Sequence, residues 1–163
     1  MSQGRLLRGM LKRIQNGEAW HGPSAAELLD TVTPEEAAAA PVPGGHSIWV
    51  LVRHIAAWRR AVASALGGGA IQELPAEVNF PQVTAVTNEA WQAAKDELEQ
   101  SSVELQAAIA KLSDDDLNQP TPGQKFPLAG SVAVVLQHDT YHLGQIALLK
   151  KLVRENAPAS AAN

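Results

Sequence analysis

Four long stretches of this chain carry apolar residues at every third or fourth position, which is the period of one face of an α-helix. They cover about residues 3–16, 47–66, 87–112 and 128–155. No segment alternates apolar and polar residues in the way that a half-buried β-strand does. Amphipathic helices bury their apolar faces against one another, so the sequence predicts an all-α fold, an antiparallel four-helix bundle.

Shorter elements complete this prediction. The segment 23–32 has the signals of a short helix, and Pro34 opens another turn, so short extra helices should follow the first long one. Residues 70–85 contain two prolines and are expected to be irregular. We expect a single domain over residues 1–155 and a disordered C-terminal tail over residues 156–163.

Composition and charge narrow the classes of function. The chain has no cysteine, so it can form no disulfide, and a metal site must use nitrogen and oxygen ligands. A net charge of −4 without a basic cluster argues against nucleic-acid binding, which depends on phosphate neutralisation. No apolar run reaches the length of a membrane span, so we expect no membrane partner and a cytoplasmic location. Four basic residues are expected on the solvated face of the first helix: Arg5, Arg8, Lys12 and Arg13.

The last long stretch places two histidines where its apolar stripe calls for core residues. Val132 and Val135 begin the stripe, and His138, His142 and Gln145 continue it. Residues four apart lie one above the other on a helix face, so both imidazoles can reach one metal ion. A buried polar ring without a partner costs on the order of 1–3 kcal/mol, and a divalent cation removes this cost by accepting a lone pair from each ring.

His54 is the best candidate for a third ligand. It stands next to Ile55 in the stripe of the second long stretch, at the edge of the buried face. Metal sites in helical bundles are built from side chains on facing helices. Three histidines leave at least one coordination position open, as catalytic rather than structural sites do. These residues alone leave a second interpretation open, in which the histidines are hydrogen-bonded core residues and no metal is bound.

Two segments, HSIWVLVRHIAAWRRAV at 46–62 and HDTYHLGQIALLKK at 138–151, together resemble the DinB/YfiT-like superfamily. The segment AWHGPSAAELL at 19–29 is similar to the opening of one branch of that family. The resemblance covers nearly the whole chain and implies a four-helix bundle, often a homodimer, with a divalent metal held by three histidines. It implies nickel or zinc, with iron or manganese as alternatives. Carried over onto this sequence, the implied ligands are His54, His138 and His142.

Four further residues are candidates for the surroundings of the site. Gln145 shares the ligand face and could hydrogen-bond a ligand ring or a metal-bound water, or else make a capping or interhelical bond. Tyr141 could offer its hydroxyl to a substrate, although packing is the preferred interpretation. Trp58 is interpreted as core or as the wall of an apolar pocket. His46 is interpreted as a loop or capping residue that could line the pocket.

Two charged residues near the proposed ligands are expected to face solvent. Asp139 lies about 100° around the helix from His138, which indicates a solvated side chain. Arg59, one of three arginines close to His54, is interpreted as an exposed helix arginine, with attraction of an anionic substrate as the alternative. The remaining tryptophans are expected in the core, with the wall of an apolar substrate pocket as the alternative: Trp20, Trp49 and Trp91.

Two classes of function remain in view. In the first, the chain is a divalent-metal-dependent enzyme; the resemblance implies a thiol-dependent S-transferase or isomerase that uses a low-molecular-weight thiol, or a hydrolase. No residue is an obvious general base, which favours the thiol route, because the metal itself can stabilise a thiolate. In the second, a non-catalytic bundle binds a small ligand or another subunit and carries a structural or sensory metal. A protein carboxylate that fills the remaining coordination position would indicate the second class.

Overall fold

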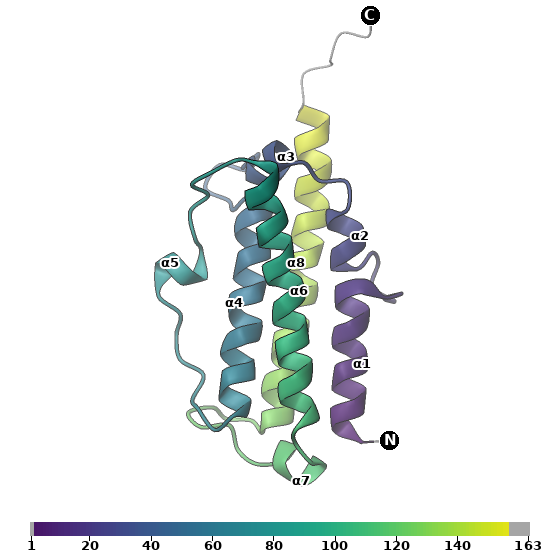
Figure 1. Cartoon of the computed structure of the whole chain (residues 1–163), viewed down its shortest axis with the longest axis vertical. Helices are drawn as coiled ribbons and strands as arrows, with labels where there is room; N and C mark the ends of the chain where they lie inside the picture. Colours follow the sequence, from purple (N-terminus) through teal and green to yellow (C-terminus); the bar gives the residue numbers. More distant parts are fainter. Residues whose placement is uncertain (1, 157–163) are drawn as a thin grey trace, which may run out of the picture.

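The computed structural model describes residues 2–156, which fold into helices and loops without a β-strand (Figure 1). The predicted all-α fold and the short helices after the first long one are confirmed. Most of the predicted tail lies outside the described residues, which end at 156. In chain order the helices are α1 (Gln3–Asn16), α2 (Ala25–Leu29), α3 (Pro34–Ala38), α4 (Ile48–Leu66), α5 (Ala76–Asn79), α6 (Asn88–Ala110), α7 (Asp114–Leu117) and α8 (Leu128–Asn156).

Local signals in the sequence set the ends of these helices. Ser24 and Thr33 each form a capping box at the start of α2 and α3, which satisfies two free backbone N–H groups at each of these helix starts. Ser47 caps α4, accepting a hydrogen bond from the backbone N–H of Val50 at 3.3 Å. Just after α4, Gly68 takes a φ of +102°, a conformation that glycine adopts without steric cost.

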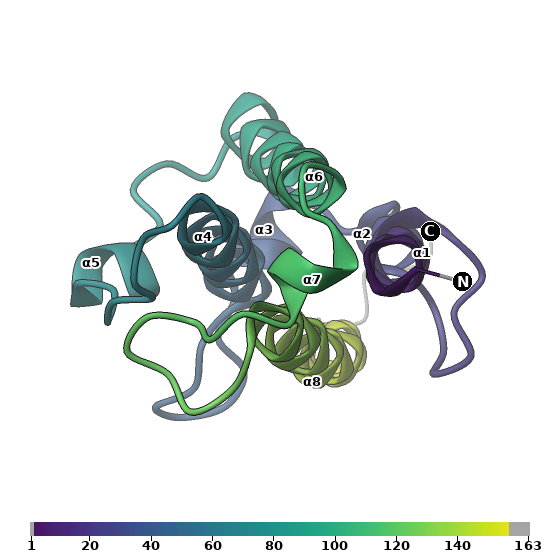
Figure 2. The same ribbon diagram turned by 90° about the horizontal axis from the view of Figure 1, so that it is seen from below.

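The four long helices α1, α4, α6 and α8 form the bundle, which Figure 2 shows from one end. Helix α4 packs between α6 and α8, and α1 closes the ring between the same two helices. Each helix turns an apolar stripe toward the axis, where the packed side chains form the core. One fully buried residue from each helix illustrates this: Leu11, Ile55, Leu105 and Val132.

Not every neighbouring pair of helices is antiparallel. Arg53 pairs with Glu97 and Arg60 with Glu104, a step of seven residues on both helices, so α4 and α6 run in the same direction. Helices α1 and α8 run the opposite way (Figure 1). Short connections favour antiparallel neighbours, but the connection 67–87 is long enough to return along all of α4, which spans about 28 Å.

An ion pair lies in the core between α4 and α8. The side chains of Arg59 and Asp139 are both 0% exposed, and Arg59 Nε donates to Asp139 Oδ2 at 2.8 Å. The guanidinium also donates from Nη1 to Gln15 Oε1 at 2.6 Å and to the carbonyl oxygen of Leu98 at 3.3 Å. The prediction that Arg59 and Asp139 face solvent is therefore wrong. The buried face of α8 includes Leu136 and Asp139 and is rotated away from the face that was predicted from His138 and His142. Asp139 therefore points to the bundle axis and not to solvent.

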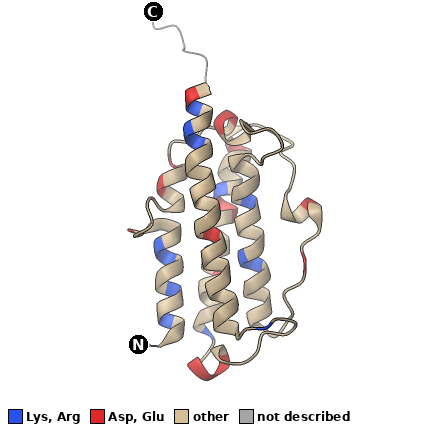
Figure 3. Ribbon diagram, turned by 180° about the vertical axis from the view of Figure 1, so that it is seen from behind, with Lys and Arg blue, Asp and Glu red and all other residues tan. Residues whose placement is uncertain are grey.

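The three tryptophans that were expected in the core divide between the core and the surface. Trp49 and Trp91 are buried with their rings 5.0 Å apart, whereas Trp20 is fully exposed in the loop after α1, where no helix face turns it inward. Basic residues recur along α1 (Figure 3), and Arg5, Lys12 and Arg13 are exposed as predicted, whereas Arg8 is half-buried. None of the helices within residues 2–156 combines the length and apolar content of a membrane-crossing segment.

The buried ion pair generates a prediction about stability. Replacing Arg59 by Met leaves the Asp139 carboxylate buried without its partner, so the free energy of unfolding should fall by about 3–5 kcal/mol. The matched control is Arg60→Met on the same helix, whose half-exposed pair with Glu104 should contribute about 0–1 kcal/mol. Urea unfolding of both variants measures the difference. Equal losses would show that burial does not distinguish the two arginines.

Candidate metal centre

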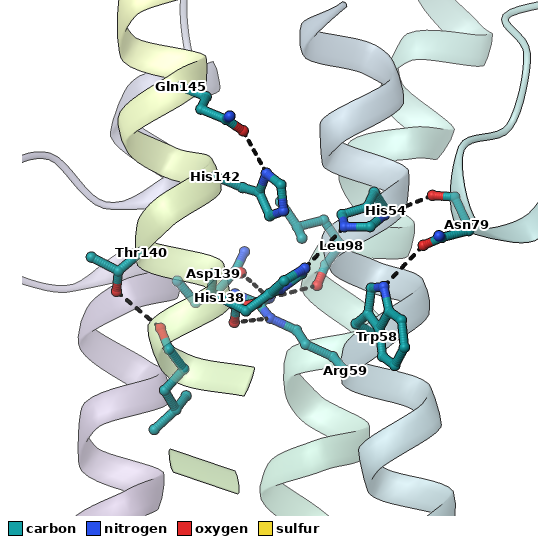
Figure 4. Close-up of polar contacts among 12 residues, drawn as sticks. His54, Trp58, Arg59, Asn79, Leu98, His138, Asp139, Thr140, His142 and Gln145 are labelled. Carbon is teal, nitrogen blue, oxygen red and sulfur yellow. Dashed lines mark hydrogen bonds and ion pairs between the residues drawn. The ribbon is translucent and has the colours of Figure 1, made fainter. Parts of the chain in front are cut away.

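Three histidines from two facing helices meet beside the core. His54 on α4 and His138 and His142 on α8 each bring a ring nitrogen to within 4.8 Å of the other two (Figure 4). The Nε2 atoms of His54 and His138 are 2.9 Å apart. His54 and His142 are buried, whereas the side chain of His138 is one quarter exposed and so lies nearer the rim than its place in the stripe suggested. The structure thus brings together the three histidines that the sequence singled out.

Two of the rings are oriented by hydrogen bonds on the side away from the cluster. His54 Nδ1 donates to the backbone carbonyl oxygen of Asn79 at 2.7 Å, since a carbonyl can only accept. His142 Nδ1 donates to Gln145 Oε1 at 2.6 Å, and the amide nitrogen of Gln145 donates to the Tyr141 hydroxyl at 3.1 Å. With the proton fixed on Nδ1, each ring presents the bare lone pair of Nε2 to the cluster, as metal-ligating histidines do.

The third ring faces a carboxylate. His138 Nδ1 and Asp139 Oδ1 lie 3.5 Å apart, and each is a buried polar atom without a hydrogen-bond partner among the described residues. The other carboxylate oxygen is held by Arg59. If His138 carries its proton on Nδ1, the N–H faces this carboxylate oxygen and the ring presents Nε2 to its neighbours, as the other two rings do.

This arrangement fits a cation. If all three rings keep their protons on Nδ1, no proton lies between the Nε2 atoms of His54 and His138, and two lone pairs oppose each other at 2.9 Å. A divalent metal accepts both lone pairs and that of His142. Three neutral imidazoles suit zinc, nickel, copper or iron. Within residues 2–156 no carboxylate joins the cluster, so the chain leaves further coordination positions open.

Burial keeps the rings of His54 and His142 in the form that binds metal. Desolvation lowers the pKa of His54, and the hydrogen bond to Asn79 only partly opposes this. The pKa of His142 is lowered to about 4, chiefly by desolvation and also by the two neighbouring histidines, while the hydrogen bond to Gln145 opposes the shift. At neutral pH both rings are therefore uncharged, and few protons compete with a metal ion for their lone pairs.

Part of the long connection between α4 and α6 packs against the cluster. The Phe80 ring stacks on His54 at a centroid distance of 4.4 Å and on the exposed His46 at 4.0 Å. Asn79, which binds His54 through its backbone, also accepts a hydrogen bond on Oδ1 from Trp58 Nε1 at 2.9 Å. Residues 70–85 were expected to be irregular, yet α5 brings Asn79 and Phe80 to the site. Sequence analysis missed both residues, because nothing in their local pattern indicates a contact with α4.

The other predicted neighbours have distinct positions. Gln145 hydrogen-bonds the ring of His142, which is the first of the two roles that the sequence suggested for it. Tyr141 is 65% exposed, so the prediction that it packs is wrong; its ring lies against His142 with centroids 5.0 Å apart. His46 stands outside the cluster and reaches it only through Phe80. Trp58 is half-buried, and its ring stands at a steep angle to that of His54 with centroids 6.5 Å apart.

Comparison with known proteins gives one result. A family model described as the DinB superfamily matches residues 20–146, which include all three clustered histidines. No curated protein and no solved structure matches the chain significantly.

The lowered pKa of His142 predicts how the metal-free protein responds to acid. In the unfolded chain this ring has its ordinary pKa of 6.5, so the unfolded state takes up the proton first as the pH falls. The free energy of unfolding should therefore decrease as the pH falls from 6.5 to about 4, and His142 should contribute no further change below that. Urea unfolding in the presence of a chelator, at a series of pH values, measures this. A His142→Gln variant should show a shallower decrease, and parallel curves for the two proteins would contradict the assignment.

Proposed function

The chain belongs to the DinB superfamily, and on this premise we propose that it is a divalent-metal-dependent enzyme. The observation that carries the proposal is the convergence of three imidazoles with no protein carboxylate in the cluster within residues 2–156. A structural site closes its coordination shell with protein ligands, whereas a catalytic site leaves room for substrate. The open positions therefore favour catalysis over a structural or sensory metal.

The proposed ligands are the Nε2 atoms of His54, His138 and His142, and nickel or zinc is the proposed metal, with iron or manganese as alternatives. The bound cation would supply Lewis acidity, polarising a substrate oxygen or stabilising the thiolate form of a thiol. The chain's own residues orient the ligands: Asn79 and Gln145 hold two rings, and Asp139, fixed by Arg59, faces the third. Such partners raise ligand basicity and fix the direction of the lone pair.

The surroundings of the cluster support a thiol-dependent transferase or isomerase over a hydrolase. A hydrolase needs a group that removes a proton from water. The carboxylate nearest to the cluster belongs to Asp139, and one of its oxygens is bound to Arg59 while the other faces His138. The Tyr141 hydroxyl accepts a bond from Gln145 on the exposed side of His142. With these groups engaged, we propose that a low-molecular-weight thiol supplies the nucleophile.

Metal analysis tests the site itself. Untagged protein prepared with ample nickel or zinc should contain about one divalent metal per chain, and His142→Ala should reduce this to a small fraction, because one of three ligands is lost. His46→Ala is the matched control, since His46 is exposed and lies outside the cluster. Elemental mass spectrometry measures the content. Equal metal content in all three proteins, or none in any, would reject the proposed ligands.

The hydrogen bond from His142 to Gln145 predicts an effect on affinity without loss of a ligand. Gln145→Leu removes the acceptor for Nδ1–H, so metal affinity should fall about 10- to 100-fold. Gln137→Leu is the control: it is an exposed amide on the same helix and should leave affinity unchanged. Competition with a chromophoric chelator gives both values. If the two variants retain the same affinity, Gln145 has no role in orienting the ligand.

Turnover distinguishes the two reaction classes. Metal-loaded protein should act on electrophilic substrates, such as activated alkenes or epoxides, only when a low-molecular-weight thiol is present. His142→Ala should abolish that activity, and His46→Ala should preserve it. Ester or amide hydrolysis without thiol, lost in the same variant, would replace the transferase assignment by a hydrolase. Full metal occupancy without activity in either screen would favour the non-catalytic bundle.

A further inference from the structure

A cavity of about 260 Å³ lies next to the cluster, between α4, α8 and two loops. His138 forms part of its wall, so one ring belongs to both the cavity and the metal centre. Ile71 comes from the long connection after α4, and Phe126 from the loop before α8. Apolar side chains form most of the wall: Trp58, Val62, Ile71, Phe126, Val134 and Val135.

The lining carries no charged side chain. Its polar members are His138, Gln124 and Ser131. The Ser131 hydroxyl already shares a hydrogen bond of 2.7 Å with buried Thr121, so it offers little to a ligand. A charged group placed here would lose its hydration without gaining a partner, which is costly. The cavity is therefore suited to an uncharged, apolar group.

The wall is held in place by the same residue that orients a proposed metal ligand. The Trp58 indole donates to Asn79 Oδ1 at 2.9 Å, and the backbone carbonyl of Asn79 accepts from His54 at 2.7 Å (Figure 4). Trp58 and His138 approach with ring centroids 6.2 Å apart. A group in the cavity thus lies against an aromatic wall whose position is coupled to that of the metal centre.

We propose that this cavity binds an apolar portion of the substrate, an aryl or branched alkyl group, while the reacting end of the same molecule lies at the metal centre. The second half of this proposal rests on the metal-dependent function proposed above; the first half does not. A dry apolar cavity of about 150 Å³ is enough to bind benzene. The observed volume accommodates a substituted ring or a branched chain of similar size.

The first arm of the test needs no metal. Titration of the metal-free protein with p-cresol, followed by NMR, should shift the indole N–H signal of Trp58 to saturation and leave that of exposed Trp20 unchanged. Val134→Asp places a charge at the half-exposed rim and should weaken p-cresol binding at least about tenfold. Val103→Asp is the control, because Val103 on α6 is equally exposed and does not line the cavity. Absence of a saturable shift at Trp58 would overturn the proposal.

The second arm uses cobalt-loaded protein and two hydroxamates with the same metal-binding head. Benzohydroxamate should bind at least about tenfold more tightly than acetohydroxamate, because only its ring can enter the cavity. Val134→Asp should remove this preference without weakening acetohydroxamate, and Val103→Asp should retain it. Cobalt absorption bands report both affinities.

The outcomes separate the two proposals. Equal affinities for the hydroxamates would overturn the role of the cavity in substrate binding and leave the metal-dependent function intact. Binding of p-cresol by a protein that takes up no metal would support the apolar site and reject the metal-dependent function.

Discussion

The guanidinium of Arg59 joins the four long helices at one point. It is fully buried on α4, it pairs with Asp139 on α8, and it donates to Gln15 on α1 and to the Leu98 carbonyl on α6. An apolar bundle gains little stability from such a pair, since desolvation offsets most of the attraction. The contribution of the pair is to fix the register of α8 against α4. A shift of α8 by one turn along α4 would leave two charges buried and unpaired, so the alignment of these helices is strongly determined.

The metal centre depends on this alignment of α4 and α8, because its three histidines come from both helices. Asp139 directly follows His138, and Arg59 lies five residues after His54, so the ion pair fixes the same stretch of the α4–α8 interface that carries the three histidines. The free oxygen of Asp139 faces His138, which connects the structural pair to a proposed ligand. Arg59 and Asp139 are not themselves proposed ligands, and only Asp139 contacts one of the three histidines. Burial keeps the rings of His54 and His142 neutral. Core stability and ligand geometry thus depend on one set of contacts.

The parallel course of α4 and α6 has an equally direct consequence for the site. Because α6 begins beside the start of α4, the chain must return along the bundle between them, and residues 67–87 do so on the outside of α4 (Figure 1). This return carries Asn79 and Phe80 against His54 and supplies Ile71 to the apolar cavity. An up-and-down bundle with a short connection at this place would leave one ligand without its hydrogen-bond acceptor.

The sequence by itself determined what depends on period and local chemistry. The four apolar stripes predicted the helical bundle and the approximate bounds of its helices, and two histidines four residues apart on a stripe indicated shared ligands. It could not decide which polar side chains would be buried, because Arg59 and Asp139 are satisfied only by residues far away in the chain. It also could not place Asn79, Phe80 or the apolar cavity, since these depend on the direction of α6 and the path of a connection without periodicity. Helix faces are set by neighbours three and four positions apart, whereas the partners of a buried charge and the walls of a cavity are set by the packing of the whole chain.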